Sequence, residues 1–194
     1  TKVLETNISE ITISDVSKIL ITSSKNRVAI CNANTLVRSV KNIEIRNSIN
    51  SFSIKTPDGF PVAKALSFLT KNKFNRVDGY KVFLQTIADG LEAGTSHYFF
   101  GNNEATTIQM IKNLKNLFPD IKISGYICPE NLTAEDLAIK YKDKFVNIEA
   151  DVVWVSLGFP KQELFIEKIY NEMNPETNFV GIGGVFDWVA GTKR

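Results

Sequence analysis

The chain has 194 residues, of which 43% are hydrophobic and 23% are charged. This length and balance are typical of one globular domain whose core is large enough to fold without disulfides or a structural metal. The 23 Lys and Arg residues nearly cancel the 21 Asp and Glu residues, so the charge gives no reason to expect a nucleic-acid partner. No apolar run is long enough to span a bilayer, which excludes a membrane channel.

The cysteines and the histidine exclude some kinds of site. Cys31 and Cys128 lie in separate apolar runs and have neither a metal-ligand spacing nor a disulfide framework. His97 is the only histidine of the chain, which argues against a His-rich metal centre. The first residues lack the apolar stretch of a signal peptide. We therefore expect a reducing, cytoplasmic location and no metal or other cofactor.

Taken in chain order, the first half of the sequence predicts two strands and three helices. An apolar run at 28–31 leads into an Asn-containing turn, which indicates a strand followed by a helix. An alternating pattern at 51–54 indicates a second strand, which runs into a Pro-Asp-Gly turn. The predicted strands are therefore 28–31 and 51–54, and the predicted helices are 35–40, 61–69 and 77–91.

The second half alternates strands and helices more regularly. The predicted strands are 97–100, 121–124, 151–157 and 179–182, and the predicted helices are 104–118, 133–145 and 161–173. Strands joined by helices of these lengths pair in parallel through right-handed crossovers. The nearly continuous apolar strand at 151–157 is typical of a strand buried on both faces. We therefore predict one α/β domain over residues 1–194, with a mostly parallel sheet and helices on both faces.

Polar or glycine-rich residues follow five of the predicted strands. An open parallel sheet binds ligands beyond the carboxyl ends of its strands, so these residues are candidates for chemistry, whereas residues within strands are interpreted as core. The five ends contain Asn32 and Asn34, Asp58 and Gly59, Gly101 and Asn102, Gly158 to Glu163, and Gly181 to Asp187.

The two longest of these ends can each be interpreted in two ways. Gly181, Gly183 and Gly184 would let backbone N–H groups approach an anion, but a tight turn needs the same residues. Their spacing is not that of a dinucleotide fingerprint, and the chain has no P-loop. Residues 160–163 open a predicted helix, whose N-terminus with Lys161 would attract anions. An ordinary well-capped helix shows the same residues, and this simpler interpretation is favoured from the residues alone.

Asp58 and Arg76 are the two charged candidates for a chemical role. Asp58 lies in an ordinary turn sequence, yet its place at a strand end also suits a general base that accepts a proton from a sugar hydroxyl. Arg76 offers a planar fork of donors for a phosphate, although most arginines are simply solvated. Structural or solvated roles are expected for the remaining candidates, which are His97, Trp154, Trp188 and the lysines from Lys64 to Lys81. For Trp188, which is next to Asp187, a role as a stacking platform stays open beside the core role.

Six short segments are informative because of the order in which they occur along the chain. They are NAN at 32–34, PDG at 57–59, RVDG at 76–79, FFG at 99–101, VSLGFPKQE at 155–163 and GIGGVFDWVAG at 181–191. Together they resemble the WecG/TagA/CpsF family (glycosyltransferase family 26). The two longest are similar to the LG-x-PKQE motif and the G-x-GG-x-FD…AG segment of that family. Each match is weak alone, but their shared order is specific.

The resemblance implies a Rossmann-like fold and a membrane-associated transferase. Such enzymes move a sugar, commonly N-acetylmannosamine or its uronic acid, from UDP to a polyprenyl-diphosphate-linked saccharide in surface polysaccharide synthesis, with inversion and without a metal. By matching position, Asp58 is implied as the base, and Asp187 with the neighbouring glycines as the contact for uracil. Asn32, Arg76 and Gln162 are implied to line the sugar and diphosphate pocket. Further substrate-binding residues implied by the matched segments are Asn34, Gly59, Gly79, Gly101, Asn102, Gly158, Pro160, Lys161, Glu163, Gly181, Gly183, Gly184 and Phe186.

The chain departs from the family pattern at several places. Ile30 stands where many members have Thr, Lys81 stands where Asp is common, and YICPEN at 126–131 replaces a frequent HHGYF stretch. These differences concern the donor sugar and the acceptor. Family members also continue beyond the position of Arg194 with a segment thought to touch the membrane. We therefore expect an absent C-terminal appendage and a peripheral location on the inner face of the cell membrane, and a homo-oligomer stays open.

Two other functions stay open from the sequence. A noncatalytic nucleotide or sugar-phosphate binding module on the same fold would bind its ligand without turnover. An NAD-dependent oxidoreductase is the third reading, and the missing glycine fingerprint after the first strand argues against it.

Overall fold

A six-stranded sheet forms the centre of the protein. The computed structural model describes residues 1–173 and 175–193. Across the sheet the strand order is β4-β3-β8-β7-β5-β6, and each neighbouring pair is parallel. The strands are β3 (Arg27–Cys31), β4 (Ile54–Pro57), β5 (Ser96–Gly101), β6 (Lys122–Ile127), β7 (Val152–Ser156) and β8 (Asn178–Gly181). A separate antiparallel pair is formed by β1 (Lys2–Val3) and β2 (Thr6–Asn7).

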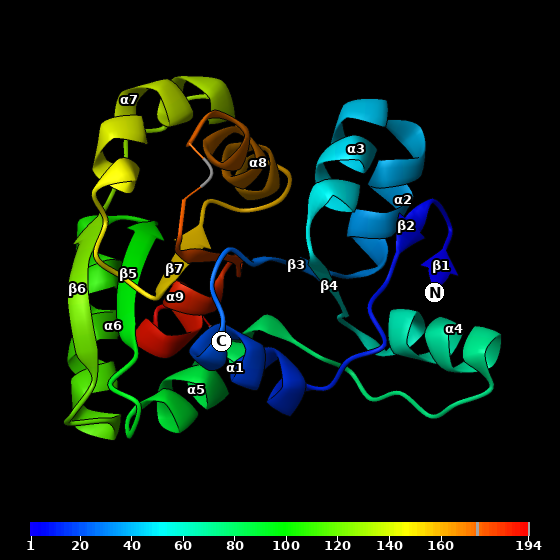
Figure 1. Ribbon diagram of the computed structural model, residues 1–194, viewed down its shortest axis with the longest axis horizontal. Coiled ribbons are helices and arrows are strands. Elements are labelled where there is room, and N and C mark those ends of the chain that lie inside the picture. Colours follow the sequence, from blue (N-terminus) through cyan, green and yellow to red (C-terminus); the bar gives the residue numbers. More distant parts are fainter. Residues whose placement is uncertain (174, 194) are drawn as a thin grey trace.

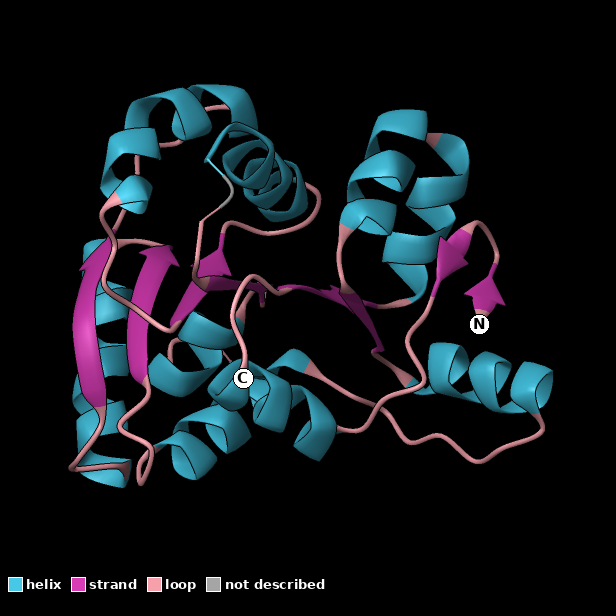
Figure 2. Cartoon of the chain, in the orientation of Figure 1, coloured by secondary structure: helices cyan, strands magenta, loops and turns pink. Residues whose placement is uncertain are grey.

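Helices cover both faces of this sheet (Figures 1 and 2). One face carries α2 (Ala33–Lys41), α3 (Ile43–Ser51), α7 (Ala134–Val146) and α8 (Lys161–Met173). The other face carries α1 (Ile13–Thr22), α5 (Gly79–Gly90), α6 (Glu104–Leu117) and α9 (Val185–Ala190). The remaining helix, α4 (Phe60–Thr70), lies at the edge of the molecule, beside β1 and β4. The prediction of one α/β domain with a Rossmann-like parallel sheet is confirmed in its fold class.

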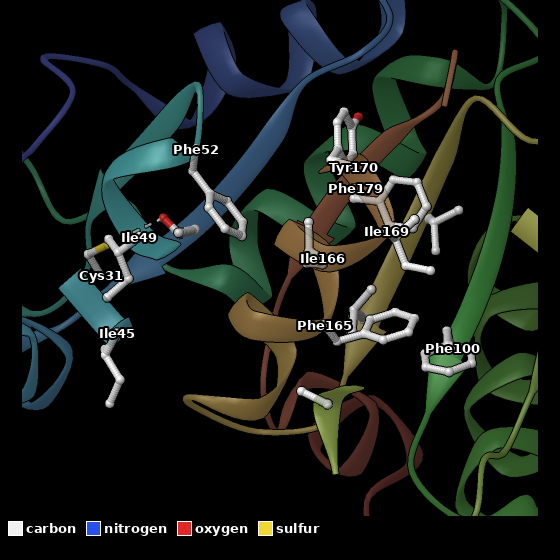
Figure 3. Close-up of a cluster of buried hydrophobic side chains, with 14 of the residues drawn as sticks. Cys31, Ile45, Ile49, Phe52, Phe100, Phe165, Ile166, Ile169, Tyr170 and Phe179 are labelled. Atoms are coloured by element: carbon white, nitrogen blue, oxygen red, sulfur yellow. Dashed lines mark hydrogen bonds between the residues drawn. The ribbon is translucent and has the colours of Figure 1, made fainter. Parts of the chain in front are cut away.

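Two hydrophobic clusters hold the helices on the sheet. In the cluster of Figure 3, the rings of Phe100 and Phe165 stack with their centroids 4.7 Å apart. On the opposite face, Phe83 packs edge-on against Trp154 at 4.9 Å. Successive residues of β7 alternate between these two clusters, with Val155 in the first and Trp154 in the second. The strand is therefore buried on both faces, as its sequence predicts.

Some predicted elements need correction. The strand expected at 51–54 begins only at Ile54, because Ser51 is the last residue of α3. The helices α1, α3 and α9 and the short strands β1 and β2 were not predicted. Local signals explain the first two of these helices: Thr12 and Asp15 form a capping box at α1, and the side chain of Asn42 accepts a hydrogen bond from the Ile45 amide at α3.

His97 is structural, as expected. Its ring is buried, and the Trp154 indole N–H donates to its Nδ1 across 3.2 Å. Burial lowers the pKa of His97 to about 4, so the imidazole is neutral at physiological pH. Within residues 1–173 and 175–193, no helix has the length and apolar character needed to cross a bilayer.

Candidate active site

A small pocket lies at the carboxyl ends of the central strands. Because the six strands are parallel, their carboxyl ends share one rim of the sheet. From the adjacent strands β3 and β8, the helices α2 and α9 leave toward opposite faces, which opens a crevice at this rim. The pocket there has a volume of about 140 Å³. The predicted residues that line it are Asn32, Asp58, Arg76, Gly79, Gln162, Glu163, Gly183 and Gly184.

Asp58 and Arg76 form an ion pair at this pocket. The Arg76 Nε–H donates to Asp58 Oδ1 across 2.9 Å, and this bond raises the pKa of Arg76. The backbone N–H of Asp58 donates to the Cys31 carbonyl, which fixes the start of the turn after β4. The Asp58 side chain is 17% exposed and that of Arg76 is 54% exposed, so water and a ligand can reach the pair.

The chain around Arg76 is held against the end of β4. The Val77 N–H donates to the Pro57 carbonyl, and the Thr56 hydroxyl donates to the Val77 carbonyl. Arg76 and Asp58 are 18 positions apart in the sequence, and these bonds bring them side by side. These backbone bonds therefore fix the position of Arg76 next to Asp58.

Asp78 is a second carboxylate beside Arg76, which the sequence analysis missed. Its Oδ2 lies 3.8 Å from Arg76 Nε, and its Oδ1 caps α5 by accepting from the Lys81 amide. The capping position before Gly79 was the available sequence signal, because Asp is a preferred N-cap residue. Thr35 and Trp188 also line the pocket and were not predicted as site residues. Phe159 lines it too and belongs to the candidate strand end from Gly158 to Glu163.

Gln162 and Gly183 join β8 to the start of α8. The Gln162 Oε1 accepts from the Gly183 N–H at 2.9 Å, and its Nε2 donates to Glu163 Oε1 at the same distance. On the other side, the Ser156 hydroxyl donates to the Gly183 carbonyl at 2.6 Å. Gly183 has a φ of 57°, in the left-handed region that favours glycine. The glycine turn is therefore fixed from two sides before a ligand arrives.

Glu163 is a buried carboxyl group on the pocket wall. Its residue is 1% exposed, and burial raises the pKa of its carboxyl to about 7. Oε1 accepts from Gln162, whereas Oε2 has no hydrogen-bond partner among the described residues. A buried oxygen without a partner is costly for a carboxylate, and this cost is why burial raises the pKa of the group.

The other predicted site residues lie outside this pocket. Asn34 is exposed on α2, and Gly59 precedes α4 with a φ of 81°. Lys161 Nζ donates to Asn131 Oδ1 at 2.8 Å. Gly101 and Asn102 end β5, which is separated from β8 by β7. Elsewhere on the rim, Gly158 and Pro160 belong to the loop before α8, and Gly181 ends β8 under the Gln162 side chain.

Two aromatic residues of the segment at 181–191 do not lie where the sequence predicts. The Phe186 ring is fully buried and packs against Phe99 with centroids 5.7 Å apart, because it lies on the inward face of α9; it is a core residue and not a pocket residue. Trp188 was expected in the core, but it is 47% exposed at the pocket. Asp187 is outside the pocket lining, and its Oδ2 lies 3.2 Å from Lys193 Nζ.

A metal would find few ligands here. Within residues 1–173 and 175–193, no group of three His, Cys, Asp or Glu side chains is arranged to hold a metal ion. Among the described residues that line the pocket, Arg76 is the cationic side chain.

The family profile described as "Glycosyl transferase WecG/TagA/CpsF family" matches residues 1–194. The chain belongs to this family. The matched segments around Asp58, Arg76, Gln162 and Gly183 contribute to the pocket, whereas the FFG segment at 99–101 lies outside it. The predicted family membership is confirmed.

Two curated relatives of the WecG/TagA/CpsF chain come from Bacillus. Both are named "N-acetylglucosaminyldiphosphoundecaprenol N-acetyl-beta-D-mannosaminyltransferase". The protein of Bacillus spizizenii strain W23 is 30% identical over 146 residues, which is 75% of this chain and 55% of the relative. The protein of Bacillus subtilis strain 168 is 27% identical over 161 residues, which is 80% of this chain and 59% of the relative. The chain thus spans little more than half the length of these relatives.

Proposed function

We propose that this protein is an inverting glycosyltransferase that transfers a hexose of the N-acetylmannosamine type from a UDP-sugar to a polyprenyl-diphosphate-linked saccharide, in the synthesis of a cell-surface polysaccharide. Membership of a glycosyltransferase family and the names of the two relatives support the transfer and the lipid-linked acceptor. The observation that carries the mechanism is the Asp58–Arg76 pair at the pocket, which sets a base and a phosphate-binding cation side by side.

The Asp58 carboxylate is the proposed base. It accepts the proton of the acceptor hydroxyl while that oxygen attacks the anomeric carbon of the donor. The new carbon–oxygen bond forms on the face opposite the diphosphate, whose bond to the same carbon breaks and leaves UDP. Attack from the opposite face inverts the configuration at that carbon. The reaction needs no redox partner, because the electron pair of the broken bond stays on the leaving diphosphate.

Arg76 is the proposed stabiliser of the departing charge. A guanidinium carries five N–H donors, and its bond to Asp58 uses the one on Nε. The terminal N–H groups suit diphosphate oxygens, where fixed positive charge favours the transition state without a metal. The glycine turn at Gly183 and Gly184 supports the same role, since backbone without side chains lets an anion come close.

The size of the pocket bears on which part of the donor it holds. A volume of about 140 Å³ is below the roughly 300–1,000 Å³ that enclose whole ligands. We therefore assign the sugar and diphosphate to this pocket, with the uracil extending along the rim toward Asp187. The imide N–H of uracil would donate to that carboxylate.

Binding of UDP tests this proposal on the chain as it stands. In a ligand-observed NMR titration with EDTA present, we expect UDP to bind while GDP and NAD do not. Arg76→Ala should weaken UDP binding by roughly 10- to 100-fold, as for the loss of a charged hydrogen bond. The matched control is Arg46→Ala, because Arg46 lies on α3 outside the pocket. Equal binding of the three nucleotides, or equal affinity in both variants, would count against the assignment.

A further inference from the structure

The outer face of α4 is unusual in what it exposes to water. The inner face of this helix buries Val62, Ala63 and Leu66. The outer face bears Phe60, 73% exposed, and Phe68, 83% exposed, which are the most exposed large hydrophobic residues among those described. We call this face the α4 outer surface and define it as Phe60, Lys64, Phe68, Leu69 and Lys71.

The helical spacing gathers these side chains into one stripe. Residues 60, 64 and 68 are separated by four positions each, so they lie above one another on the same side of the helix, and Lys71 follows directly as the C-cap residue of α4. Aromatic and basic residues alternate along it, and Lys64 Nζ lies 5.7 Å from the centre of the Phe60 ring. Leu69, 52% exposed, widens the apolar part. A solvated face of an ordinary helix would not place two Phe rings in water.

The charge of this region is strongly one-sided. Residues 60–73 contain Lys64, Lys71 and Lys73 and no acidic residue, although the whole chain has nearly equal numbers of acids and bases. The surface therefore favours an anionic partner. A symmetric contact with a second copy of the chain would bring two positively charged surfaces together, which costs free energy.

The α4 outer surface is also joined directly to the candidate active site. The helix begins two residues after Asp58, and the chain that follows it runs back along the edge of the molecule to Arg76 (Figures 1 and 2). Asp58 and Arg76 are hydrogen-bonded to each other, so the segment from Asp58 through α4 to Arg76 begins and ends at the pocket. Whatever the helix rests on is therefore held close to the proposed base.

We propose that the α4 outer surface docks on an anionic lipid bilayer. Phe60, Phe68 and Leu69 enter the boundary between headgroups and acyl chains, while Lys64 and Lys71 lie against lipid phosphates. Phe and Lys side chains on one helix face are suited to this boundary. The docked helix presents the pocket to a saccharide whose diphosphate sits at headgroup level, and this part of the inference rests on the proposed function.

Vesicle flotation tests the docking with the chain itself. We expect binding to phosphatidylcholine vesicles that contain phosphatidylglycerol, weaker binding as salt rises, and little binding to phosphatidylcholine alone. The double variant Phe68→Ser with Leu69→Ser should need about tenfold more lipid, as expected when apolar burial in the interface is lost. Its matched control is Ile139→Ser with Val146→Ser, two exposed apolar residues of α7, which should leave binding unchanged.

The lysines are tested in the same way. Lys64→Gln with Lys71→Gln should weaken binding to the anionic vesicles by about fivefold per lysine, and the difference should disappear at high salt. Lys142→Gln with Lys144→Gln on α7 is the control of equal charge change. These side chains are outside the core, so thermal unfolding should confirm that the four variants keep the fold.

Several results would overturn the proposal. They are absence of vesicle binding, equal binding to neutral and anionic vesicles, or binding that the α4 variants and the α7 controls change equally. A dimer in lipid-free buffer that dissociates with Phe68→Ser and Leu69→Ser would assign the surface to a second copy instead. UDP titration of the same preparations keeps the two proposals apart: α4-dependent vesicle binding without UDP selectivity rejects the proposed function alone, and the reverse rejects only the docking.

Discussion

Asp58 and Arg76 offset each other's charge at the pocket, and this pairing sets what a substitution should do. The carboxylate is held at 2.9 Å from the guanidinium, in a turn fixed by its own backbone. An amide in its place can still accept a hydrogen bond from Arg76 but cannot take up a proton. An Asn at position 58 therefore removes the basicity of the side chain while keeping its shape.

Asp58→Asn should abolish transfer and leave UDP binding nearly unchanged. Loss of a general base lowers rates by about 10²- to 10⁴-fold. The measurement is transfer by the full-length protein to a lipid-linked acceptor, with UDP titration beside it. Asp143→Asn, an exposed acid of α7, is the control. Transfer that survives Asp58→Asn would remove Asp58 from the mechanism.

Glu163 should make the free energy of unfolding depend on pH. Burial raises the pKa of its carboxyl from 4.5 to about 7, so between these values the folded protein holds a proton that the unfolded chain releases. Stability from this group is fully present below about pH 4.5 and is lost as the pH rises through 7. His97 acts in the opposite direction between about 4 and 6.5, because its pKa is lowered.

Comparison with Glu163→Gln isolates this dependence, since the His97 contribution cancels. We expect the variant to gain stability relative to the parent between pH 5 and pH 8, by on the order of 3 kcal/mol or less. Denaturant unfolding at the two pH values measures the difference. Parallel pH profiles of parent and variant would show that Glu163 ionises normally in the folded protein.

At the scale of elements, the contact between β8 and α8 depends on Gly181. A Cβ at this position would lie 3.0 Å from Gln162 Nε2, so Gln162 would have to move, and with it the bond to the Gly183 N–H. The close contact between the end of β8 and the start of α8 therefore requires a residue without a side chain at position 181.

Gly181→Ala should lower both stability and UDP affinity. The overpacked contact costs about 1–3 kcal/mol, and the displaced Gln162 no longer fixes the glycine turn. Gly184→Ala is the steric control: its Cβ would meet Asp187 Oδ2 at 3.8 Å, an ordinary contact, and its φ of −77° suits any residue. Thermal unfolding distinguishes the two, and Gly184→Ala is a control for stability alone because Gly184 lines the pocket. Equal stability loss in both variants would contradict the packing argument.

The elements that sequence reasoning found and missed differ in their physical signals. The helix at 161–173 was predicted with its observed bounds, because Pro160 marks its start and its apolar residues are regular. In contrast, α3 buries little beyond Ile45 and Ile49, so its pattern is weak, and α9 has only six residues. Asp78 and Thr35 were missed because their place at the pocket depends on the turns after β4 and β3.

At the scale of the whole molecule, the two rims of the sheet have different roles. The carboxyl rim holds the candidate active site, whereas at the amino rim Asn178 cross-links several chain segments. The Asn178 Nδ2 donates to the carbonyls of Leu20, Ser23 and Asp151, and its Oδ1 accepts from the Asn26 N–H. One buried side chain thus ties the end of α1 and the starts of three neighbouring strands.

Asn178→Ala should cost about 2–4 kcal/mol of stability, because it leaves several buried backbone groups without partners. UDP affinity measured well below the melting temperature should be unchanged, since the pocket is at the opposite rim. Asn116→Ala, on the exposed face of α6, is the control. A loss of UDP affinity in Asn178→Ala would mean that the two rims are coupled.

The overall architecture could be predicted because it follows from regular alternation of strands and helices. Which strand ends meet could not, since the order β4-β3-β8-β7-β5-β6 places β8 beside β3. That neighbourhood brings Gly183 to Asp58 and leaves Gly101 and Asn102 farther along the rim. We expected Phe186 at the pocket and Trp188 in the core, and the structure shows the reverse. The short α9 turns Phe186 inward and Trp188 outward.

The hydrogen bond from Trp154 to His97 gives the sheet a built-in reporter. Because Nδ1 accepts this bond, the neutral ring carries its proton on Nε2. The chain has no other imidazole, so its nitrogen NMR signals belong to one known residue without any assignment. A variant that disturbs the packing of β5 on β7 would shift those signals, and a variant that alters only the rim would leave them in place.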